Sequence, residues 1–254
     1  MGFEGRTVYV TGASSGIGAQ LARELAGRGA TVGLLARRGE RLRELAGEIA
    51  DGGGTAGWRA ADVTDRGALH AVCAALAAEI GEPDVAIANA GWNRFESMPN
   101  FKPGRALAIY DTNLYGFLHL VDWVLPRFLE RGAGQLVGVS SLASYVGFPN
   151  NAAYSGSKAA MRLHLQSLRL SLKPRGIAVT TICPGFVDSE LTAKNRYRMP
   201  FLWPTDRACR YMADAIDKRR GEVAFPWQMR LVVCLLLARL IPRALLERLM
   251  ARGG

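Results

Sequence analysis

The sequence has few cysteines and histidines, and their spacing argues against a disulfide framework and against a metal site. The four cysteines form no Cys-x-x-Cys pair and lie far apart, at Cys73, Cys183, Cys209 and Cys234. This spacing predicts neither a zinc site nor a disulfide framework, so we expect free buried thiols. No His-Glu-x-x-His spacing connects His70, His119 and His164. We therefore predict no metal site and expect these histidines on helix surfaces or as satisfied core residues.

The charge is unbalanced, but the motifs of nucleic-acid binding are missing. The 254 residues carry a formal net charge of +10, which favours anionic partners. No arginine-rich arm, zinc-finger spacing or aromatic RNA-binding motif accompanies this charge, so we expect no nucleic-acid partner. The basic excess instead suits a phosphorylated cofactor or an anionic membrane surface.

Low-complexity tracts and repeats are also lacking, and we expect no amino-terminal signal peptide. Apolar residues make up 49% of the chain and charged residues 21%, which is an ordinary globular balance. The chain passes from Met1 to Gly5 and then directly into apolar residues 8–10, which leaves no room for a signal peptide before the first predicted strand. We expect one domain in a reducing, cytoplasmic setting.

Short β-rich runs alternate with helical patterns along most of the chain. We predict strands at 6–10, 31–36, 56–61, 84–88, 134–140 and 176–182. Between them, apolar residues at three- and four-residue spacing predict helices at 16–28, 39–50, 65–80, 104–131 and 151–173. This alternation is typical of parallel βαβ units. The predicted fold class is α/β, with a single Rossmann-like doubly wound parallel sheet and helices on both faces, within residues 1–225.

A glycine-rich turn lies directly after the first predicted strand and opens the first predicted helix. It reads Thr-Gly-Ala-Ser-Ser-Gly-Ile-Gly over residues 11–18. In a dinucleotide fold, Gly12 would allow a sharp turn, Gly16 a close approach to a pyrophosphate and Gly18 close packing of the helix on the sheet. The backbone amides at the helix start would meet the phosphate charge. Taken alone, the pattern also fits a glycine-rich turn without a ligand.

Four further motifs make the chain resemble the short-chain dehydrogenase/reductase family over about residues 5–190. The turn resembles the cofactor fingerprint of that family, and Asn-Ala-Gly at 89–91 resembles a second family element. Tyr154 and Lys158 match the Tyr-x-x-x-Lys motif, Ser141 precedes Tyr154 by the usual thirteen residues, and Pro-Gly follows at 184–185. Several motifs in the right order are far more specific than any one of them.

The resemblance implies a nicotinamide cofactor, a small-molecule substrate and a homodimer or homotetramer. Carried over residue by residue, it implies cofactor contacts from Gly12, Ser14, Ser15, Gly16, Ile17, Gly18, Arg37, Arg38, Asp62, Val63, Asn89, Ala90, Gly91, Tyr154, Lys158, Pro184, Gly185, Val187 and Ser189. Ser189 replaces the threonine common in the family but retains a hydroxyl. The implied catalytic residues are Asn113, Ser141, Tyr154 and Lys158.

The residues that follow the second strand favour NADP(H) over NAD(H). An NAD enzyme places Asp or Glu about twenty residues after the glycines to bind the ribose 2'-hydroxyl. Here Arg37 and Arg38 occupy that region, and the first acid is Glu40. A guanidinium can bind a 2'-phosphate through charge-assisted hydrogen bonds, whereas a carboxylate would repel it. The alternative is that both arginines merely begin a solvated helix surface.

The chemistry of carbonyl reduction explains why a tyrosine and a lysine are needed together. Tyrosine can donate a proton to the forming alcohol, but its ordinary pKa of about 10 is too high for efficient exchange near neutrality. Lys158 lies four residues beyond Tyr154, on the same helix face, where its charge can lower the tyrosine pKa. Outside such a set of motifs, a tyrosine and a lysine at this spacing are more often structural than catalytic. We expect Ser141 to hydrogen-bond the substrate oxygen and Ser140 to be packed or bonded to backbone.

Asn113 and Ser141 each have an alternative interpretation. The family resemblance gives Asn113 a role in a water chain to the lysine, whereas a plain buried helix asparagine is the alternative. A serine hydrolase is the mechanistic rival, but Gly-x-Ser-x-Gly is absent around Ser141. Nucleophilic attack by Ser141 is therefore disfavoured.

Residues 186–205 are predicted to carry substrate specificity, because connections at the carboxyl ends of strands line the ligand crevice. This segment combines apolar Phe201, Leu202 and Trp203 with basic residues at Lys194, Arg196 and Arg198. Two interpretations stay open: a lid over an apolar pocket, or a solvated loop.

The carboxyl-terminal extension, residues 226–254, is unusually apolar. As a helix, 231–238 would be apolar around its whole circumference, yet it is too short to span a bilayer. Beyond Pro242, an apolar stripe of Leu245, Leu246, Leu249 and Met250 opposes Arg243, Glu247 and Arg248. Two interpretations stay open: burial against the domain or a second subunit, or peripheral contact with an anionic membrane surface. We expect the extension to help wall the active-site entrance.

Taken together, the residues predict an NADP(H)-dependent oxidoreductase that interconverts a hydrophobic, lipid-like ketone and a secondary alcohol, with Tyr154 as general acid and base. The alternative is a noncatalytic nucleotide-binding or scaffold protein that uses its apolar tail to hold a partner or a membrane. The complete set of Ser141, Tyr154 and Lys158 favours the enzyme.

Overall fold

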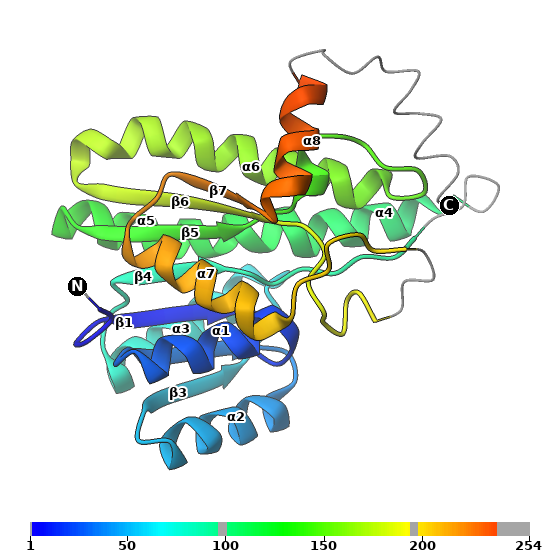
Figure 1. Ribbon diagram of the computed structural model, residues 1–254. Helices are drawn as coiled ribbons and strands as arrows, with labels where there is room; N and C mark the ends of the chain where they lie inside the picture. Colours follow the sequence, from blue (N-terminus) through cyan, green and yellow to red (C-terminus); the bar gives the residue numbers. More distant parts are fainter. Residues whose placement is uncertain (1, 96–100, 194–197, 238–254) are drawn as a thin grey trace.

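A computed structural model of the protein describes residues 2–95, 101–193 and 198–237, and contains one seven-stranded parallel sheet (Figure 1). The strand order is β3-β2-β1-β4-β5-β6-β7. The strands are β1 (Thr7–Thr11), β2 (Thr31–Ala36), β3 (Thr55–Ala60), β4 (Val85–Ala88), β5 (Gly134–Val139), β6 (Ile177–Pro184) and β7 (Glu222–Phe225). Every residue of β4 and β5 is buried, as a sheet covered on both faces requires.

The crossover connections are helical, as the apolar spacing predicts. The helices are α1 (Gly16–Gly27), α2 (Gly39–Asp51), α3 (Arg66–Ile80), α4 (Pro103–Tyr110), α5 (Gly116–Arg131), α6 (Ala152–Leu172), α7 (Thr205–Asp217) and α8 (Trp227–Leu237). The predicted helix at 104–131 is interrupted by a π-helical turn, Asp111–Tyr115. Helix α7 and strand β7 were not among the predicted elements, and β7 adds the seventh strand to the sheet.

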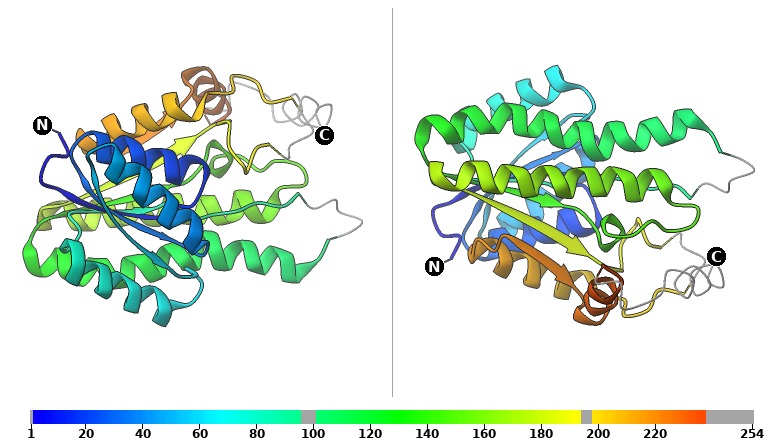
Figure 2. Two further views of the ribbon diagram at one scale, coloured as in Figure 1. Left: turned by 90° about the horizontal axis from the view of Figure 1, so that it is seen from below. Right: turned by 90° about the horizontal axis from the view of Figure 1, so that it is seen from above.

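Helices cover both faces of the sheet and confirm the predicted fold class. Figure 2 shows α1, α2 and α7 on one face and α3, α5 and α6 on the other. Each face has its own apolar core. Leu21, Leu42 and Met212 belong to the first core, and Leu69, Phe128 and Leu165 belong to the second.

The strand order reverses between β1 and β4, and this reversal creates the place where a ligand can bind. The chain moves outward from β1 to β2 and β3, then returns to β4 and continues in the other direction. Adjacent crossovers therefore leave the sheet on opposite faces at this point, and the ligand crevice of a doubly wound fold is expected beyond the carboxyl ends of β1 and β4. In Figure 1, β1 runs from left to right, and α8 rises from the carboxyl end of β7.

The burial of α6 gives a direct test of the fold. Leu165 is fully buried, and its side chain lies so close to β5 that a Cβ on Gly138 would be 2.3 Å from Leu165 Cδ1. We predict that Leu165→Ala lowers the free energy of unfolding by about 2–5 kcal/mol, because the cavity it leaves cannot collapse fully.

Leu163→Ala is the matched control on the same helix. Leu163 is 56% exposed, so its truncation should change the free energy of unfolding by less than about 0.5 kcal/mol. Denaturant titration of both variants provides the measurement. Equal losses in the two variants would contradict the described orientation of α6.

Candidate active site

The glycine-rich turn after β1 is held against the loop after β4 by a close backbone contact. A Cβ on Gly12 would be 2.8 Å from Ala90 Cα, and a Cβ on Gly18 would be 2.2 Å from the carbonyl oxygen of Gly12. The Asn89 amide donates to the carbonyl oxygens of Thr11 at 3.0 Å and Gly12 at 3.3 Å. Only glycine fits at these two positions, so the turn and the Asn-Ala-Gly loop form one rigid cradle.

The cradle has the features that a pyrophosphate requires. Helix α1 begins at Gly16, its N-cap is Ser15, and no side chain caps the first turn among the described residues. Gly16 has a φ of 53°, a backbone conformation that favours glycine. The amides of the first helical turn and the positive end of the helix dipole are suited to a phosphate group. Residues 12–18 therefore fit the dinucleotide cofactor that the sequence predicts, with Ile17 packed against the first core.

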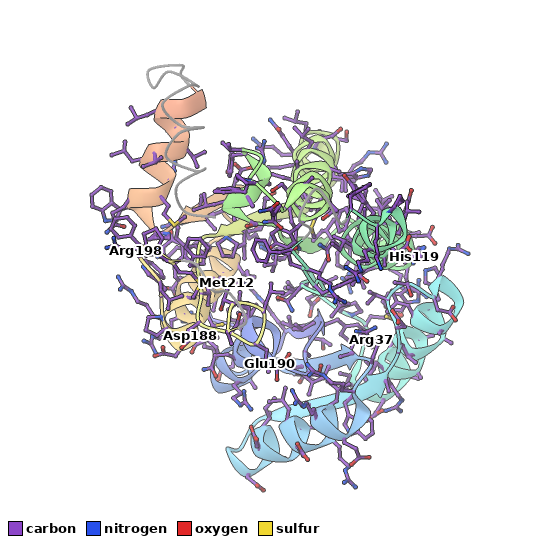
Figure 3. The ribbon with its side chains drawn as sticks, turned by 90° about the vertical axis from the view of Figure 1, so that its right-hand side faces the viewer. Arg37, His119, Asp188, Glu190, Arg198 and Met212 are labelled. Atoms are coloured by element: carbon purple, nitrogen blue, oxygen red, sulfur yellow. The ribbon has the colours of Figure 1, made fainter. Side chains whose placement is uncertain are left out.

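Arg37 and Arg38 point in different directions. Arg38 donates from Nε to Ser14 Oγ at 3.0 Å and from Nη2 to Ser15 Oγ, so its guanidinium lies over the glycine-rich turn. Arg37 instead pairs with Asp62 at 3.5 Å and lies apart from Glu190 in Figure 3. Arg38 is thus the arginine that the structure brings to the cradle.

Asp62 and Val63, which follow β3, take up separate structural roles. Burial acts to raise the pKa of Asp62, but hydrogen bonds from Thr64 and the charge of Arg37 outweigh it and keep the pKa below its usual range. Val63 is buried beneath Gly116, where a Cβ would be 2.5 Å from Val63 Cγ2. The two residues fix the loop after β3 beside the crevice.

Asn113 connects the loop after β4 with helix α6. It lies in the π-helical turn and is fully buried. Its Oδ1 accepts from the backbone N–H of Trp92 at 2.9 Å, and its Nδ2 donates to the Trp92 carbonyl and to Ser157 Oγ, each at 3.1 Å. Ser157 in turn donates to the carbonyl oxygen of Tyr154 at 2.8 Å. One amide therefore sets the distance between the loop and the Tyr154 turn.

Lys158 is buried at the junction of β5, α6 and the Asn-Ala-Gly loop. Its ammonium donates to the Val139 carbonyl at 2.8 Å and lies 6.0 Å from the centroid of the Tyr154 ring. A Cβ on Gly91 would be 3.2 Å from Lys158 Nζ and 3.1 Å from Asn113 Oδ1. Burial lowers the pKa of Lys158 from 10.5 to about 8. The structure thus brings Asn113 and Gly91 next to Lys158, which lies on α6, the helix that carries Tyr154.

The two serines after β5 differ in their contacts. Ser140 is buried and donates to the carbonyl oxygen of Lys158 at 2.9 Å, which confirms the expected backbone bond. Ser141 accepts from the backbone N–H of Ala143 at 3.1 Å and begins a 3-10 turn at 142–144. Its hydroxyl is less buried than that of Ser140, and its O–H remains a donor.

The predicted specificity segment is tied down at its base. Val187 forms a β-bridge with Trp203, and Trp203 stacks on Phe225 with ring centroids 5.0 Å apart, so this tryptophan belongs to the core and not to a lid. Phe201 and Leu202 are exposed. Ser189 lies against the cradle, since a Cβ on Gly16 would be 3.3 Å from Ser189 Cβ. Lys194 and Arg196 lie outside the described residues.

Comparisons with known proteins identify the family. A family model described as short chain dehydrogenase matches residues 6–199. The chain belongs to this family. An uncharacterised oxidoreductase of Myxococcus xanthus is 43% identical over 242 residues, which cover 95% of each chain.

Solved structures of this family share the fold of the short-chain dehydrogenase described above. A putative NAD(P)-dependent gluconate 5-dehydrogenase of Beutenbergia cavernae, with NADP bound at low occupancy, is 30% identical with a TM-score of 0.79, covering 88% of this chain and 96% of its own. A gluconate 5-dehydrogenase of Burkholderia cenocepacia, in complex with NADP and tartrate, is 25% identical with a TM-score of 0.80, covering 89% and 96%. These similarities confirm the predicted family, and the chain is an oxidoreductase of the short-chain type.

Helix α8 packs beside the candidate site of this dehydrogenase. Met229 and Val233 pack against Leu142, Cys183 and Ala224, and a Cβ on Gly185, just after Pro184, would be 2.8 Å from Met229 Sδ. This inner face of α8 therefore covers the Pro-Gly turn after β6.

The outer face of α8 is open in the described structure. Trp227, Leu231 and Val232 are exposed, as is Cys234. The expectation of four buried thiols is therefore wrong for Cys234, because its side chain lies on the outer face, whereas the other three are buried. No described helix is long and apolar enough to cross a membrane. Membrane or subunit contact by residues 226–254 stays a prediction, and the amphipathic stripe after Pro242 lies outside the described residues.

The histidines and carboxylates of the dehydrogenase form no metal site in the part of the chain that the structure describes. His119 bonds the Val63 carbonyl at 2.9 Å, and His70 bonds the His119 carbonyl at 3.1 Å. His164 packs edge-on against Phe117. His70 and His119 thus occupy hydrogen-bonded positions, and His164 is exposed on the surface of α6, as expected.

Four residues of the site were missed by the sequence analysis. Ser157 lies within Tyr-x-x-x-Lys and Trp92 directly follows Asn-Ala-Gly, so position alone could have pointed to both. Glu190 and Arg41 carry no such signal. Glu190 pairs with Arg41 and with Arg38, and hydrogen bonds from Arg41 and Arg38 lower the pKa of Glu190 to about 2.

The burial of Lys158 predicts a pH dependence of stability. The lysine pKa is about 8 in the folded protein and 10.5 without burial, so the unfolded chain binds more protons between these pH values. The contribution of Lys158 to the free energy of unfolding should therefore rise with pH over this window, by up to about 3 kcal/mol.

Comparison with Lys158→Met isolates this effect. The free energy of unfolding of the wild type minus that of Lys158→Met should increase between pH 7.5 and pH 10.5, as measured by urea denaturation. Lys173→Met removes an exposed lysine and should give a difference that is constant with pH. A constant difference for Lys158→Met would contradict its lowered pKa.

Proposed function

We propose that this short-chain dehydrogenase interconverts a hydrophobic ketone and a secondary alcohol with NADP(H), and that Tyr154 is the general acid and base. The observation that carries the proposal is the contact of Asn113 and Gly91 with the part of α6 that bears Tyr154 and Lys158. This cluster lies at the strand reversal, next to a cradle that fits a pyrophosphate. A noncatalytic scaffold would need no buried lysine at this place.

Each residue has a defined task in the proposed reduction. Residues 12–18 and Arg38 would hold NADPH, which would supply the hydride for the carbonyl carbon. Tyr154 donates its phenolic proton to the carbonyl oxygen, which becomes the alcohol hydroxyl, and then recovers a proton from solvent. Lys158 stabilises the resulting phenolate by its charge. Ser141 donates a hydrogen bond to the same oxygen and stabilises the charge that develops there.

Asn113 acts as a positioning residue in this proposal. Its three hydrogen bonds join the Trp92 backbone to Ser157. Because Ser157 bonds the Tyr154 carbonyl, Asn113 sets the orientation of the helical turn that presents the phenol. Precise orientation of reacting groups is one of the largest sources of enzymatic rate enhancement.

The preference for NADP(H) is supported by Arg38 and by two solved relatives. Arg38 is bonded to Ser14 and Ser15 at the cradle, where its remaining donors can bind a 2'-phosphate. The Beutenbergia and Burkholderia structures both contain NADP. We do not propose gluconate, for which both relatives are named, as the substrate of this chain, because the exposed side chains of Leu191, Phe201 and Leu202 in the segment after β6 favour an apolar substrate.

Removing the phenol should abolish turnover without loss of cofactor binding. We expect Tyr154→Phe to lower kcat by about 10²–10⁴, since general acid catalysis contributes a factor of this size, while the Kd of NADPH stays within about threefold. NADPH absorbance with a panel of hydrophobic ketones gives the rate, and fluorescence titration gives the Kd. Tyr115→Phe, which removes an exposed phenol, is the control and should retain the wild-type rate. Undiminished turnover by Tyr154→Phe would exclude the proposed acid.

Removing one guanidinium should separate the two cofactors. We expect Arg38→Ala to raise the Kd of NADPH by about 10- to 100-fold, because charge-assisted hydrogen bonds contribute about 1.5–3 kcal/mol, with little change for NADH. Arg37→Ala removes the same charge from a group paired with Asp62, and its effect should be below about threefold. Isothermal titration calorimetry measures the Kd of NADPH and of NADH for both variants. An equal loss for NADH and NADPH would exclude recognition of the phosphate by Arg38.

A further inference from the structure

A carboxylate from the specificity segment lies among the arginines that surround the cradle. Glu190 accepts from Arg38 Nη1 at 3.1 Å through one oxygen and from Arg41 through the other. Figure 3 shows Glu190 and Asp188 on the same segment at the carboxyl edge of the sheet. Glu190 belongs to the segment after β6, whereas Arg38 and Arg41 belong to the start of α2, so the contact bridges parts of the chain about 150 residues apart.

The donors around Glu190 match a phosphate monoester better than a single carboxylate. They are the guanidinium groups of Arg38 and Arg41 and the hydroxyl of Ser15. Planar guanidinium forks bind phosphate oxygens through paired hydrogen bonds. A phosphate dianion would neutralise both arginines, whereas Glu190 supplies one negative charge for two positive ones. The carboxylate thus stands where the 2'-phosphate of the proposed cofactor would bind.

We propose that Glu190 is an internal competitor for this phosphate position, and that it sets how strongly the enzyme prefers a 2'-phosphorylated cofactor. The inference rests on the proposed use of NADP(H). In the free protein, Glu190 holds Arg38 and Arg41 in place and ties the segment after β6 to α2. When the phosphate binds, Glu190 must leave, because two anions cannot share the same guanidinium donors at close range.

The local structure gives this exchange a consequence for the segment itself. Ser189 and Thr192 are linked by side-chain and backbone hydrogen bonds, with Ser189 N donating to Thr192 Oγ1 at 3.0 Å. Glu190 lies inside this short turn, and Ser189 lies against Gly16 of the cradle. Loss of the Glu190 contacts therefore frees the turn from α2 at the same moment that the cradle is filled. Cofactor binding and movement of residues 188–193 are coupled.

The test compares Glu190→Gln with Glu40→Gln. Glutamine keeps the size of the side chain but removes its charge, so it cannot compete with a phosphate. Glu40 lies on the same helix as Arg41 but pairs with Arg43, so Glu40→Gln changes the net charge equally and leaves the Glu190 contacts intact. The probes are 2',5'-ADP, which carries the phosphate, and 5'-AMP, which lacks it.

We expect Glu190→Gln to bind 2',5'-ADP roughly three- to tenfold more tightly than the wild type, because two exposed ion pairs no longer have to be broken. The Kd of 5'-AMP should not change, and Glu40→Gln should match the wild type with both probes. Without any nucleotide, hydrogen exchange at the amides of Leu191–Ala193 should be faster in Glu190→Gln than in the other two proteins.

The outcomes separate this inference from the proposed function. If the wild type prefers 2',5'-ADP over 5'-AMP but Glu190→Gln gains no affinity for 2',5'-ADP, the competitor role is wrong while the cofactor assignment stands. If the wild type shows no preference for 2',5'-ADP, the NADP(H) assignment fails and the competitor role fails with it. Unchanged hydrogen exchange in Glu190→Gln would refute the proposed tie between the segment and α2, whichever nucleotide binds.

Discussion

The buried amide of Asn113 is the interaction on which the candidate site depends. It satisfies the backbone of Trp92 and the hydroxyl of Ser157 from inside a π-helical turn, and π-turns of this kind are frequent at functional sites. A buried amide that loses a partner costs about 1–3 kcal/mol, so the loop after β4 and the start of α6 cannot move apart easily. The cradle, Lys158 and the Tyr154 turn are therefore held in one frame.

Within that frame, charge is distributed in two different ways. Lys158 is buried and has a lowered pKa of about 8, so its charge acts at short range in a medium that screens it little. Arg38 and Arg41, beside the cradle, are half-exposed and are paired with Glu190. A buried amine suits proton transfer, whereas exposed guanidinium groups suit exchange of one anion for another. In the proposed reaction, Lys158 would assist proton transfer by Tyr154, and the exposed guanidinium groups would bind the 2'-phosphate of the cofactor.

The sequence predicts the fold and the family well, because both rest on local signals. Strand and helix periodicity, the glycines of residues 12–18 and the ordered motifs are all readable from short windows. Helix α7 and β7 escaped prediction, since β7 has only four residues and is defined mainly by its pairing with β6. The pairing of Glu190 with Arg38 could not be predicted either, because it depends on how a long segment after β6 returns across the crevice. The exposure of Cys234 could not be predicted for a similar reason, because α8 is apolar on all sides over residues 231–237 and only its packing shows which side is covered.

The most direct measurement is a crystal structure of the dehydrogenase with NADP⁺. We expect the pyrophosphate against the turn of residues 12–18, the 2'-phosphate on Arg38 in place of Glu190, and the nicotinamide ring beside the Tyr154 hydroxyl. Movement of Lys158 from the Val139 carbonyl toward the cofactor would agree with this arrangement. A dinucleotide bound away from the β1 and β4 strand ends, or a Tyr154 hydroxyl pointing away from the nicotinamide, would contradict it.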